Sequence, residues 1–144
     1  MNLKIKHQFE IGEYFEKLTA LDIYCNLTFS VNNTALFKSG VELLHFSTVM
    51  FDMLDQFAGS RKAGSSSYYH TNFKIEQTKK PFEIRFWVGN ENKKERSAIL
   101  DKSCFFSNLL DFLENSFRYL EKTVPDENYN VTFSHIKTLR KALA

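Results

Sequence analysis

Hydrophobic and polar residues alternate along the first part of the chain, and this period of two is typical of half-buried β-strands. The alternation runs from Leu3 to Ile11 and again from Leu21 to Val31. The pair Asn32-Asn33 follows directly, and asparagine tolerates the positive φ angles of a tight hairpin turn. We therefore expect residues 34–38 to return as a third antiparallel strand.

After this hairpin the period changes to that of a helix. Apolar residues recur at spacings of three and four from Leu43 to Phe57. Ser39, followed three residues later by Glu42, has the arrangement of a capping box. In such a box each of the two side chains accepts a hydrogen bond from the backbone N–H of the other residue. Gly59 is a natural C-terminal cap. The sequence therefore predicts a long helix between these caps.

The middle of the chain is predicted to be a loop followed by a meander. Residues 59–67, GSRKAGSSS, are small, polar and basic without an apolar period, which indicates a flexible loop inside one domain. Alternation then resumes. It predicts strands over residues 69–75, 82–88 and 95–100, with turns at 78–81 and 89–92.

A second long helix is predicted to begin between Ser103 and Ser107 and to end before Pro125. Its apolar face comprises Phe106, Leu109, Leu110, Leu113, Phe117 and Leu120. In the tail, a short helix is expected to place Ile136, Leu139 and Leu143 on one side and Lys137, Arg140 and Lys141 on the other.

These elements give three strands and a helix, twice, and then a short helix. We predict one α+β domain over residues 1–144, with antiparallel sheet in a duplicated strand-strand-strand-helix arrangement. Both long helices are expected to pack on one side of the sheet. The 15 phenylalanines among 144 residues indicate a phenylalanine-rich core.

The net charge of +2 is too small to argue for a nucleic-acid binder by itself. The charge is nevertheless uneven. Residues 1–60 hold four Lys/Arg and seven Asp/Glu, giving −3, whereas residues 61–102 hold ten and five, giving +5. The first part of the chain is thus acidic and the middle is basic.

No run approaches the roughly 18 apolar residues of a membrane span, and the alternating, charged start lacks the apolar core of a signal peptide. We therefore expect a cytoplasmic protein without membrane contact. Cys25 and Cys104 lie in apolar patterns, and in that compartment we interpret them as buried thiols rather than a disulfide.

Catalytic and cofactor motifs are absent from the sequence. The five glycines form neither a Walker pattern nor GxGxxG, and the four histidines and two cysteines lack metal-ligand spacing. We expect His7 to point inward on the first strand and His45 to be a satisfied core residue. No enzymatic activity, cofactor or metal is predicted.

Arg85 and Trp87 fall on the face opposite Phe82, Ile84, Phe86 and Val88 in the stretch PFEIRFWV. If one face of the sheet is open, the strand phases place on it Asp22, Tyr24, Tyr68, His70, Lys74, Arg85 and Trp87. Aromatic rings between cations suit single-stranded nucleic acid. Trp, Tyr and Arg are also enriched in protein–protein hot spots. A third interpretation is that Tyr14-Phe15 or the tail helix covers Trp87.

The charge distribution favours protein recognition over nucleic acid on this face. A general nucleic-acid binder neutralises several phosphates with a strongly basic surface. Here the acidic first part offsets the basic middle, and Glu76 and Glu83 lie within or beside the face.

The layout of the hairpin LDIYCNLTFSVNNTALF, the helix GVELLHFSTVMFDMLDQFAGS, the meander around FEIRFWV and the helix FFSNLLDFLENSFRYLEK resembles that of small bacterial toxin-immunity proteins, of contact-dependent or polymorphic-toxin type. The duplicated order of elements is also similar to the topology of Whirly-type domains, which bind single-stranded DNA. The first resemblance implies a cytoplasmic protein without enzymatic activity. Such a protein binds one cognate toxin, 1:1 or within a larger complex, and occludes its active site.

The resemblance to immunity proteins implies a toxin that is often a nuclease, and because nuclease clefts are commonly basic, complementary carboxylates speed encounter. The candidate carboxylates are Glu10, Glu13, Glu16, Asp22, Asp52 and Asp55. The second candidate surface is the tryptophan face, with Tyr24, Tyr68, His70, Arg85 and Trp87. The leading hypothesis is an immunity protein, and the alternative is a single-stranded nucleic-acid binding domain.

Overall fold

The computed structural model of the chain describes residues 1–90 and 93–144. Helices and strands follow one another in the order β1 (Lys4–Ile11), η1 (Ala20–Asp22), β2 (Ile23–Val31), β3 (Thr34–Glu42), α1 (Leu43–Ser60), β4 (Ala63–Tyr68), β5 (Thr71–Gln77), β6 (Glu83–Asn90), β7 (Lys93–Asp101), α2 (Lys102–Thr123) and α3 (Asn130–Ala142). The short element η1 is a 3₁₀ helix.

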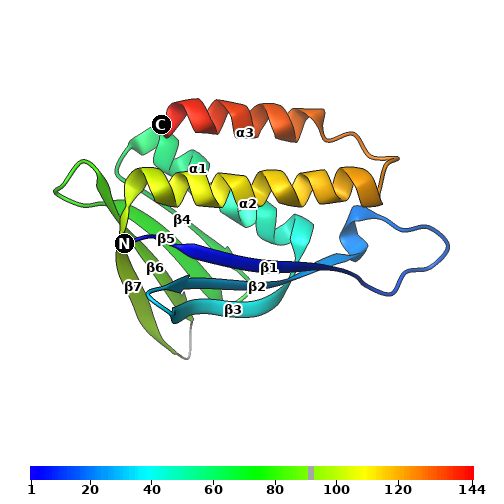
Figure 1. The fold of residues 1–144 in the computed structure, drawn as a ribbon, viewed down its shortest axis with the longest axis horizontal. Helices are drawn as coiled ribbons and strands as arrows, with labels where there is room; N and C mark the ends of the chain where they lie inside the picture. The colour runs from blue at the N-terminus through cyan, green and yellow to red at the C-terminus, as the bar shows by residue number, and fades with distance from the viewer. Residues whose placement is uncertain (91–92) are drawn as a thin grey trace.

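The strands form two antiparallel sheets, so the predicted α+β class is confirmed (Figure 1). Sheet A has the order β1-β2-β3, and sheet B has the order β4-β5-β6-β7. Each sheet is followed in the chain by a long helix, and α3 ends the chain as predicted. The second sheet has four strands rather than three.

The fourth strand, β4, corrects the prediction of a flexible loop over residues 59–67. Its residues are small because α1 approaches closely: a Cβ atom at Gly64 would collide with the carbonyl oxygen of Met53. Gln56 of α1 also donates to the carbonyl oxygen of Ser65 (2.8 Å) and accepts from its N–H (3.1 Å). The composition that resembles a mobile segment thus reflects tight helix–strand packing.

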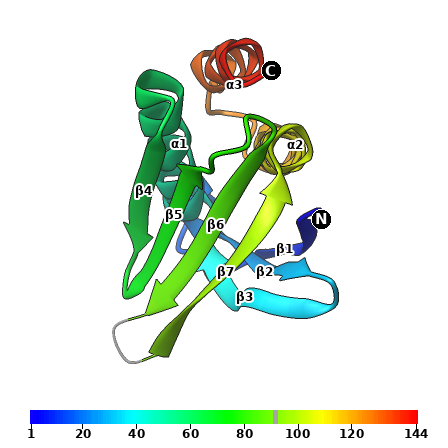
Figure 2. The same cartoon turned by 90° about the vertical axis from the view of Figure 1, so that its left-hand side faces the viewer.

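The core lies where the inner faces of the two sheets meet (Figure 2). The ring centroid of Phe29 in β2 lies 6.1 Å from that of Phe86 in β6 and 5.9 Å from that of Phe46 in α1. In the same view α1 and α2 occupy the angle between the sheets, and α3 lies outside them. The outer faces of both sheets are therefore uncovered by helices.

The ends of α1 differ from the prediction. β3 continues through Ser39 to Glu42, so the expected capping box does not form, and Glu42 makes no side-chain cap. Its backbone N–H is instead bound by Tyr68 Oη at 2.9 Å. At the other end the helix passes Gly59, and Arg61 forms the left-handed cap with φ 62°.

The helices α2 and α3 agree closely with the sequence. α2 begins at Lys102, one residue earlier than predicted, because Asp101 caps it by accepting from the backbone N–H of Cys104. Every residue of its predicted apolar face is buried, as are Ile136, Leu139 and Leu143 in the tail. None of the helices in residues 1–90 and 93–144 combines the length and apolar character needed to cross a bilayer.

The remaining comparisons with the prediction concern two turns and the burial of individual side chains. Asn32 and Asn33 have φ angles of 50° and 64°, as expected for the hairpin. Of the turn predicted at 89–92, Gly89 and Asn90 belong to β6, and residues 91–92 lie outside the described residues. Five side chains depart from their predicted burial and are exposed: His7, Ile11, Leu21, His45 and Phe82.

Candidate functional site

The residues predicted to contact a partner fall in three separate places. Glu10, Glu13, Glu16, Asp22 and Tyr24 lie at one end of sheet A, on β1, β2 and the connection between them. Asp52 and Asp55 lie on the exposed side of α1. Tyr68 and His70 belong to the β4–β5 hairpin, and Arg85 and Trp87 lie on the outer face of sheet B.

Four members of the predicted tryptophan face are placed differently from the prediction. Tyr68 is buried, because its ring packs on Phe46 with 5.5 Å between centroids. His70 lies in the two-residue turn after β4 rather than in a strand. Asp22 belongs to η1, where its carboxylate accepts from Thr19 N at 2.8 Å. Tyr24 lies on sheet A, so it does not share a face with Trp87.

The two carboxylates of α1 are exposed, as the pattern predicted, and both bind within the molecule. Asp55 Oδ1 lies 2.7 Å from His135 Nε2 of α3. Asp52 accepts from Ser66 Oγ of β4 at 3.3 Å. Both contacts join α1 to its neighbours.

One row of the outer face of sheet A brings predicted residues together. Glu10 of β1, Tyr24 of β2 and Glu42 of β3 are direct neighbours in the strand register. The exposed ring of Tyr24 thus lies between two carboxylates. The Tyr24 ring packs so closely on Gly12 that a Cβ atom on residue 12 would lie 2.6 Å from it.

Glu42 extends this row to the β4–β5 hairpin. Tyr69 donates a hydrogen bond of 2.7 Å to Glu42 Oε2, and His45 Nδ1 lies 3.5 Å from the same oxygen. The bond to Glu42 raises the pKa of the Tyr69 phenol. Tyr69 is 64% exposed and has a φ of 51°, a left-handed conformation that a bulky side chain rarely adopts.

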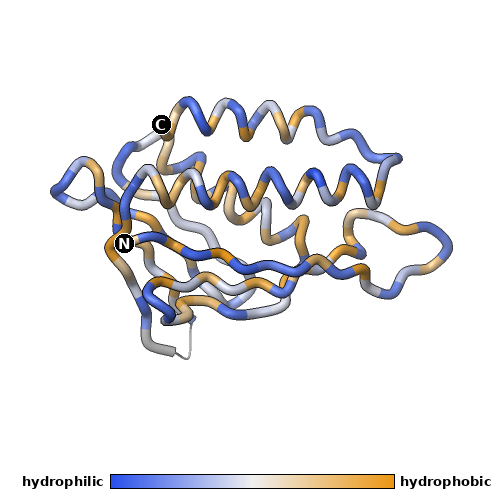
Figure 3. The backbone as a smooth tube through the Cα atoms, in the orientation of Figure 1, coloured by the Kyte–Doolittle hydropathy of each residue, from blue (hydrophilic) through white to orange (hydrophobic). Residues whose placement is uncertain are grey.

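The β1–β2 connection carries the most exposed apolar side chains beside this row. Phe15 is 97% exposed, and three neighbours of the same connection are also exposed: Ile11, Tyr14 and Leu21. In Figure 1 this segment projects from the body, and Figure 3 shows hydrophobic and hydrophilic positions interspersed along it. Glu13 and Glu16 lie between the apolar residues.

The exposed part of the connection is held by hydrogen bonds and an ion pair, whereas Leu18 and Ala20 near its end pack on the core. Lys17 N donates to the carbonyl oxygen of Phe15 at 2.6 Å across Glu16, whose φ is 58°. At its base Gly12 N donates to Asp22 O at 2.7 Å. Lys17 Nζ also pairs with Asp126 at 2.8 Å.

We call the resulting surface the acidic-aromatic edge. Aromatic and aliphatic side chains lie there among carboxylates, the composition of a protein-binding surface with anchors for a partner's pockets. It comprises Glu10, Ile11, Glu13, Tyr14, Phe15, Glu16, Leu21, Tyr24, Glu42 and Tyr69. Of this set, the sequence analysis predicted only Glu10, Glu13, Glu16 and Tyr24 to contact a partner, and it considered Tyr14-Phe15 only as a cover for Trp87. The sequence signal for the exposed connection is the aromatic pair Tyr14-Phe15, which lies between Glu13 and Glu16 in a segment without helical or strand periodicity.

The outer face of sheet B is internally paired. Trp87 Nε1 donates to Glu76 Oε1 at 2.8 Å, and Lys74 Nζ lies 3.4 Å from Glu76 Oε2. Arg85 lies 5.5 Å from the Trp87 ring centroid and donates to Ser97 Oγ at 3.0 Å. The indole bond lowers the pKa of Glu76 and Lys74 lowers it further, so a carboxylate stays ionised beside the tryptophan. Tyr14 and Phe15, both exposed, do not cover this ring.

The cysteines show no sign of activation as nucleophiles. Burial raises the pKa of the Cys25 thiol to about 11. The hydrogen bond with Asp101 raises the pKa of the Cys104 thiol. A reactive cysteine needs the opposite shift. In the part of the chain that the structure describes, no three His, Cys, Asp or Glu side chains are grouped so as to hold a metal ion.

Comparison with known proteins gives no significant match to this chain, whether with protein-family models, with curated proteins or with solved structures.

Proposed function

We propose that this chain is an immunity-type protein, which binds a protein toxin through the acidic-aromatic edge and occludes a basic active-site cleft. The observation that carries the proposal is Phe15, 97% exposed at the tip of a connection that also presents Tyr14 and Leu21. Burying a phenylalanine contributes roughly 1.5–3 kcal/mol, and in the free chain Phe15 does not gain this free energy. A partner that covers the ring would gain it on binding.

The charges around Phe15 support a basic partner. Five carboxylates belong to this end of sheet A: Glu10, Glu13, Glu16, Asp22 and Glu42. Lys17 is the basic residue of the connection, and it is paired with Asp126. A nuclease cleft that binds phosphates is basic, and complementary charge raises the rate of encounter. In this proposal the protein acts in the cytoplasm and needs no chemistry of its own.

The strain in the edge fits a preorganised interface. Tyr69 and Glu16 hold left-handed φ angles that glycine would adopt more easily. Anchoring of the Tyr69 phenol by Glu42 limits the entropy that the side chain loses on binding.

Nucleic-acid binding on the tryptophan face has less support. An ionised Glu76 accepts the indole N–H, and a phosphate backbone tracking past Arg85 would approach that carboxylate. Protein recognition at the acidic-aromatic edge involves no such repulsion.

The test is capture of a stoichiometric protein from the native host by tagged wild type, Phe15→Ser and Val131→Ser, followed by assay of the captured protein's toxicity. Val131 is a matched control, 83% exposed on α3. We expect wild type and Val131→Ser to capture and neutralise the same toxin, and Phe15→Ser to lose about 2 kcal/mol, roughly thirtyfold in Kd.

A second pair of variants tests the charges. Glu13→Gln with Glu16→Gln should slow association at low salt, whereas Glu83→Gln with Glu95→Gln, which remove the same charge from sheet B, should not. Equal capture by Phe15→Ser would contradict the proposal. Retention of nucleic acid that Trp87→Ala abolishes, without a protein partner, would support the alternative.

A further inference from the structure

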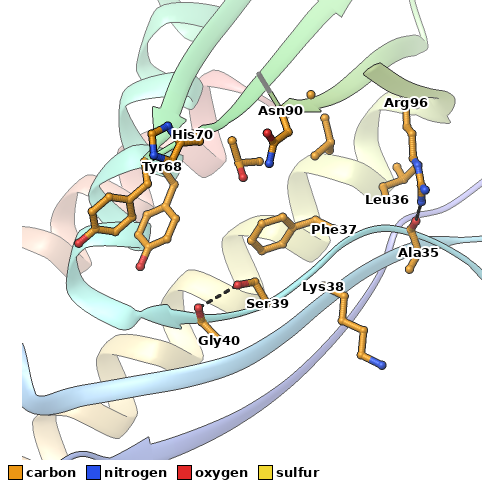
Figure 4. Close-up of a pocket in the computed structure, with 14 residues that line it drawn as sticks. Ala35, Leu36, Phe37, Lys38, Ser39, Gly40, Tyr68, His70, Asn90 and Arg96 are labelled. Carbon is orange, nitrogen blue, oxygen red and sulfur yellow. Dashed lines mark hydrogen bonds between the residues drawn. The ribbon is translucent and has the colours of Figure 1, made fainter. Parts of the chain in front are cut away.

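A hollow of about 590 Å³ lies between the edge of sheet A and one end of sheet B (Figure 4). β3 forms one wall with residues 35–40. The β4–β5 hairpin, the end of β6 and Arg96 form the other. We call this hollow the inter-sheet groove. Tyr69 is the one residue that it shares with the acidic-aromatic edge.

The edge of β3 faces this groove. β3 is the last strand of sheet A, and two hydrogen bonds show where its outer edge points. Glu42 N–H donates to Tyr68 Oη at 2.9 Å, and Arg96 Nη1 donates to the carbonyl oxygen of Ala35 at 2.8 Å. Both partners lie on the sheet B side of the groove.

Backbone groups along a strand alternate in direction, so Gly40 and Lys38 turn their N–H groups the same way as Glu42. The register shift in the β2–β3 ladder falls at Leu36 on β3, between Ala35 and Phe37, and so does not affect the alternation from Lys38 to Glu42. Within residues 1–90 and 93–144, neither N–H has a hydrogen-bond partner across the groove. A strand edge of this kind is a template for an added strand.

The volume of the groove suits a few residues of extended chain. The groove volume of about 590 Å³ lies within the range of roughly 300–1,000 Å³ found for small-ligand sites. A folded helix or domain of a partner would need more space. The distance from Ala35 to Glu42 is about 23 Å at 3.3 Å per residue, so roughly five residues fit between the two closing bonds.

Side chains of an added strand would alternate between two environments. On the inner side lies Phe37, which points into the hollow in Figure 4 and is stacked on Phe46 with 5.8 Å between centroids. On the outer side lies Lys38, which points away from the hollow and has no ion pair with a described residue. Arg96 adds a second cation at the Ala35 end.

We propose that the inter-sheet groove binds an extended segment of a protein partner, with alternating apolar and acidic residues, as a fourth strand of sheet A. Its apolar side chains lie against the part of Phe37 that remains exposed, 8% of the residue, and its carboxylates face Lys38 and Arg96. Gly40 carries no side chain of its own next to Lys38, and the Asn26 side chain of β2 lies beside it. This inference does not depend on the function proposed for the acidic-aromatic edge.

The probe is an acetylated and amidated pentapeptide, Glu-Val-Glu-Val-Glu, titrated into the ¹⁵N-labelled full chain. We expect saturable shifts centred on the amides of Lys38, Ser39 and Gly40. Replacing its glutamates by lysines should weaken binding about tenfold or more, as should Lys38→Glu. Lys6→Glu is the matched control, since Lys6 lies in the same row of sheet A on the far strand, β1.

Strand pairing itself is tested by N-methylation. Of two further peptides, methylated either on every valine or on every glutamate, one should lose binding and the other should retain it, because alternate amides face β3. Equal binding of both methylated peptides, shifts centred on β1, or no saturable binding at millimolar peptide would overturn the proposal.

Discussion

The Tyr69 hydroxyl donates a hydrogen bond of 2.7 Å to Glu42 Oε2, joining the turn between β4 and β5 to the last residue of β3. This bond crosses from sheet B to sheet A at the point where the acidic-aromatic edge meets the inter-sheet groove. It fixes an exposed aromatic ring that has an unfavourable backbone angle. Glu42, which accepts this bond, is also the residue that directly precedes α1.

Glu42→Gln should lower the pKa of the Tyr69 phenol, because the charged acceptor that favours the protonated phenol is removed. In the native protein this pKa is raised above the unfolded value. The stabilisation from the bond is therefore fully present below the ordinary tyrosine pKa and is lost as the pH rises through the folded value. Tyrosine ¹³Cζ shifts followed by NMR through alkaline pH would measure both effects. An unchanged Tyr69 titration in Glu42→Gln would show that another group causes the shift.

Gly64→Ala should destabilise the fold by about 1–3 kcal/mol or more, because the new methyl group would collide with the carbonyl of Met53 in α1. Gly59→Ala is the matched control: it adds the same methyl group in α1 with nothing within 4 Å. There alanine should stabilise the helix by up to about 1 kcal/mol. Urea unfolding of the two variants would compare them. Similar midpoints would mean that β4 does not pack on α1 as described.

Trp87 is the single tryptophan of the chain and should report the ionisation of Glu76. The pKa of Glu76 is lowered in the folded protein, chiefly by the indole hydrogen bond. Its contribution to stability is therefore present above the unfolded pKa and is lost as the pH falls through the folded one. We expect a change in tryptophan emission with a midpoint below the ordinary glutamate pKa. The same change should be absent from Glu76→Gln, and its persistence there would assign it to another group.

Asp101→Asn should raise the reactivity of Cys104 toward a thiol reagent. The hydrogen bond with Asp101 is the main cause of the raised Cys104 pKa, so removing the carboxylate charge increases the thiolate fraction near pH 8. Because asparagine also caps helices well, the stability of α2 should change little. The buried Cys25, with a pKa of about 11, should remain unlabelled in both folded proteins. Equal rates of Cys104 labelling would contradict this role of Asp101.

The sequence by itself determined most of the elements of this fold. The period of two predicted β1 and β2, the pair Asn32-Asn33 predicted their hairpin with β3, and helical spacing predicted the buried faces of α1 and α2. Local periodicity is sufficient there because each element buries one face, and the burial imposes its own period on the residues.

Only the tertiary structure decided which small or polar residues lie in contacts between distant segments. β4 carries no apolar period because α1 lies too close for side chains at Gly64, a contact between segments that no local pattern encodes. Glu42 was expected to cap a helix, but Tyr68, distant in sequence, binds its N–H and Tyr69 takes its carboxylate. Long-range partners of this kind override local capping preferences.

The candidate site divides in the same way. Glu10, Glu13 and Glu16 were predicted from the acidic first part of the chain and the resemblance to immunity proteins, and Tyr24 from strand phase. Phe15, Glu42 and Tyr69 joined the site only once β1, β2, β3 and the β4–β5 hairpin were placed together. The predicted single open face proved to be two, because the strands divide into separate sheets with Tyr24 on one and Trp87 on the other. Strand phase assigns a side chain to a face, but the pairing between strands decides which faces are shared.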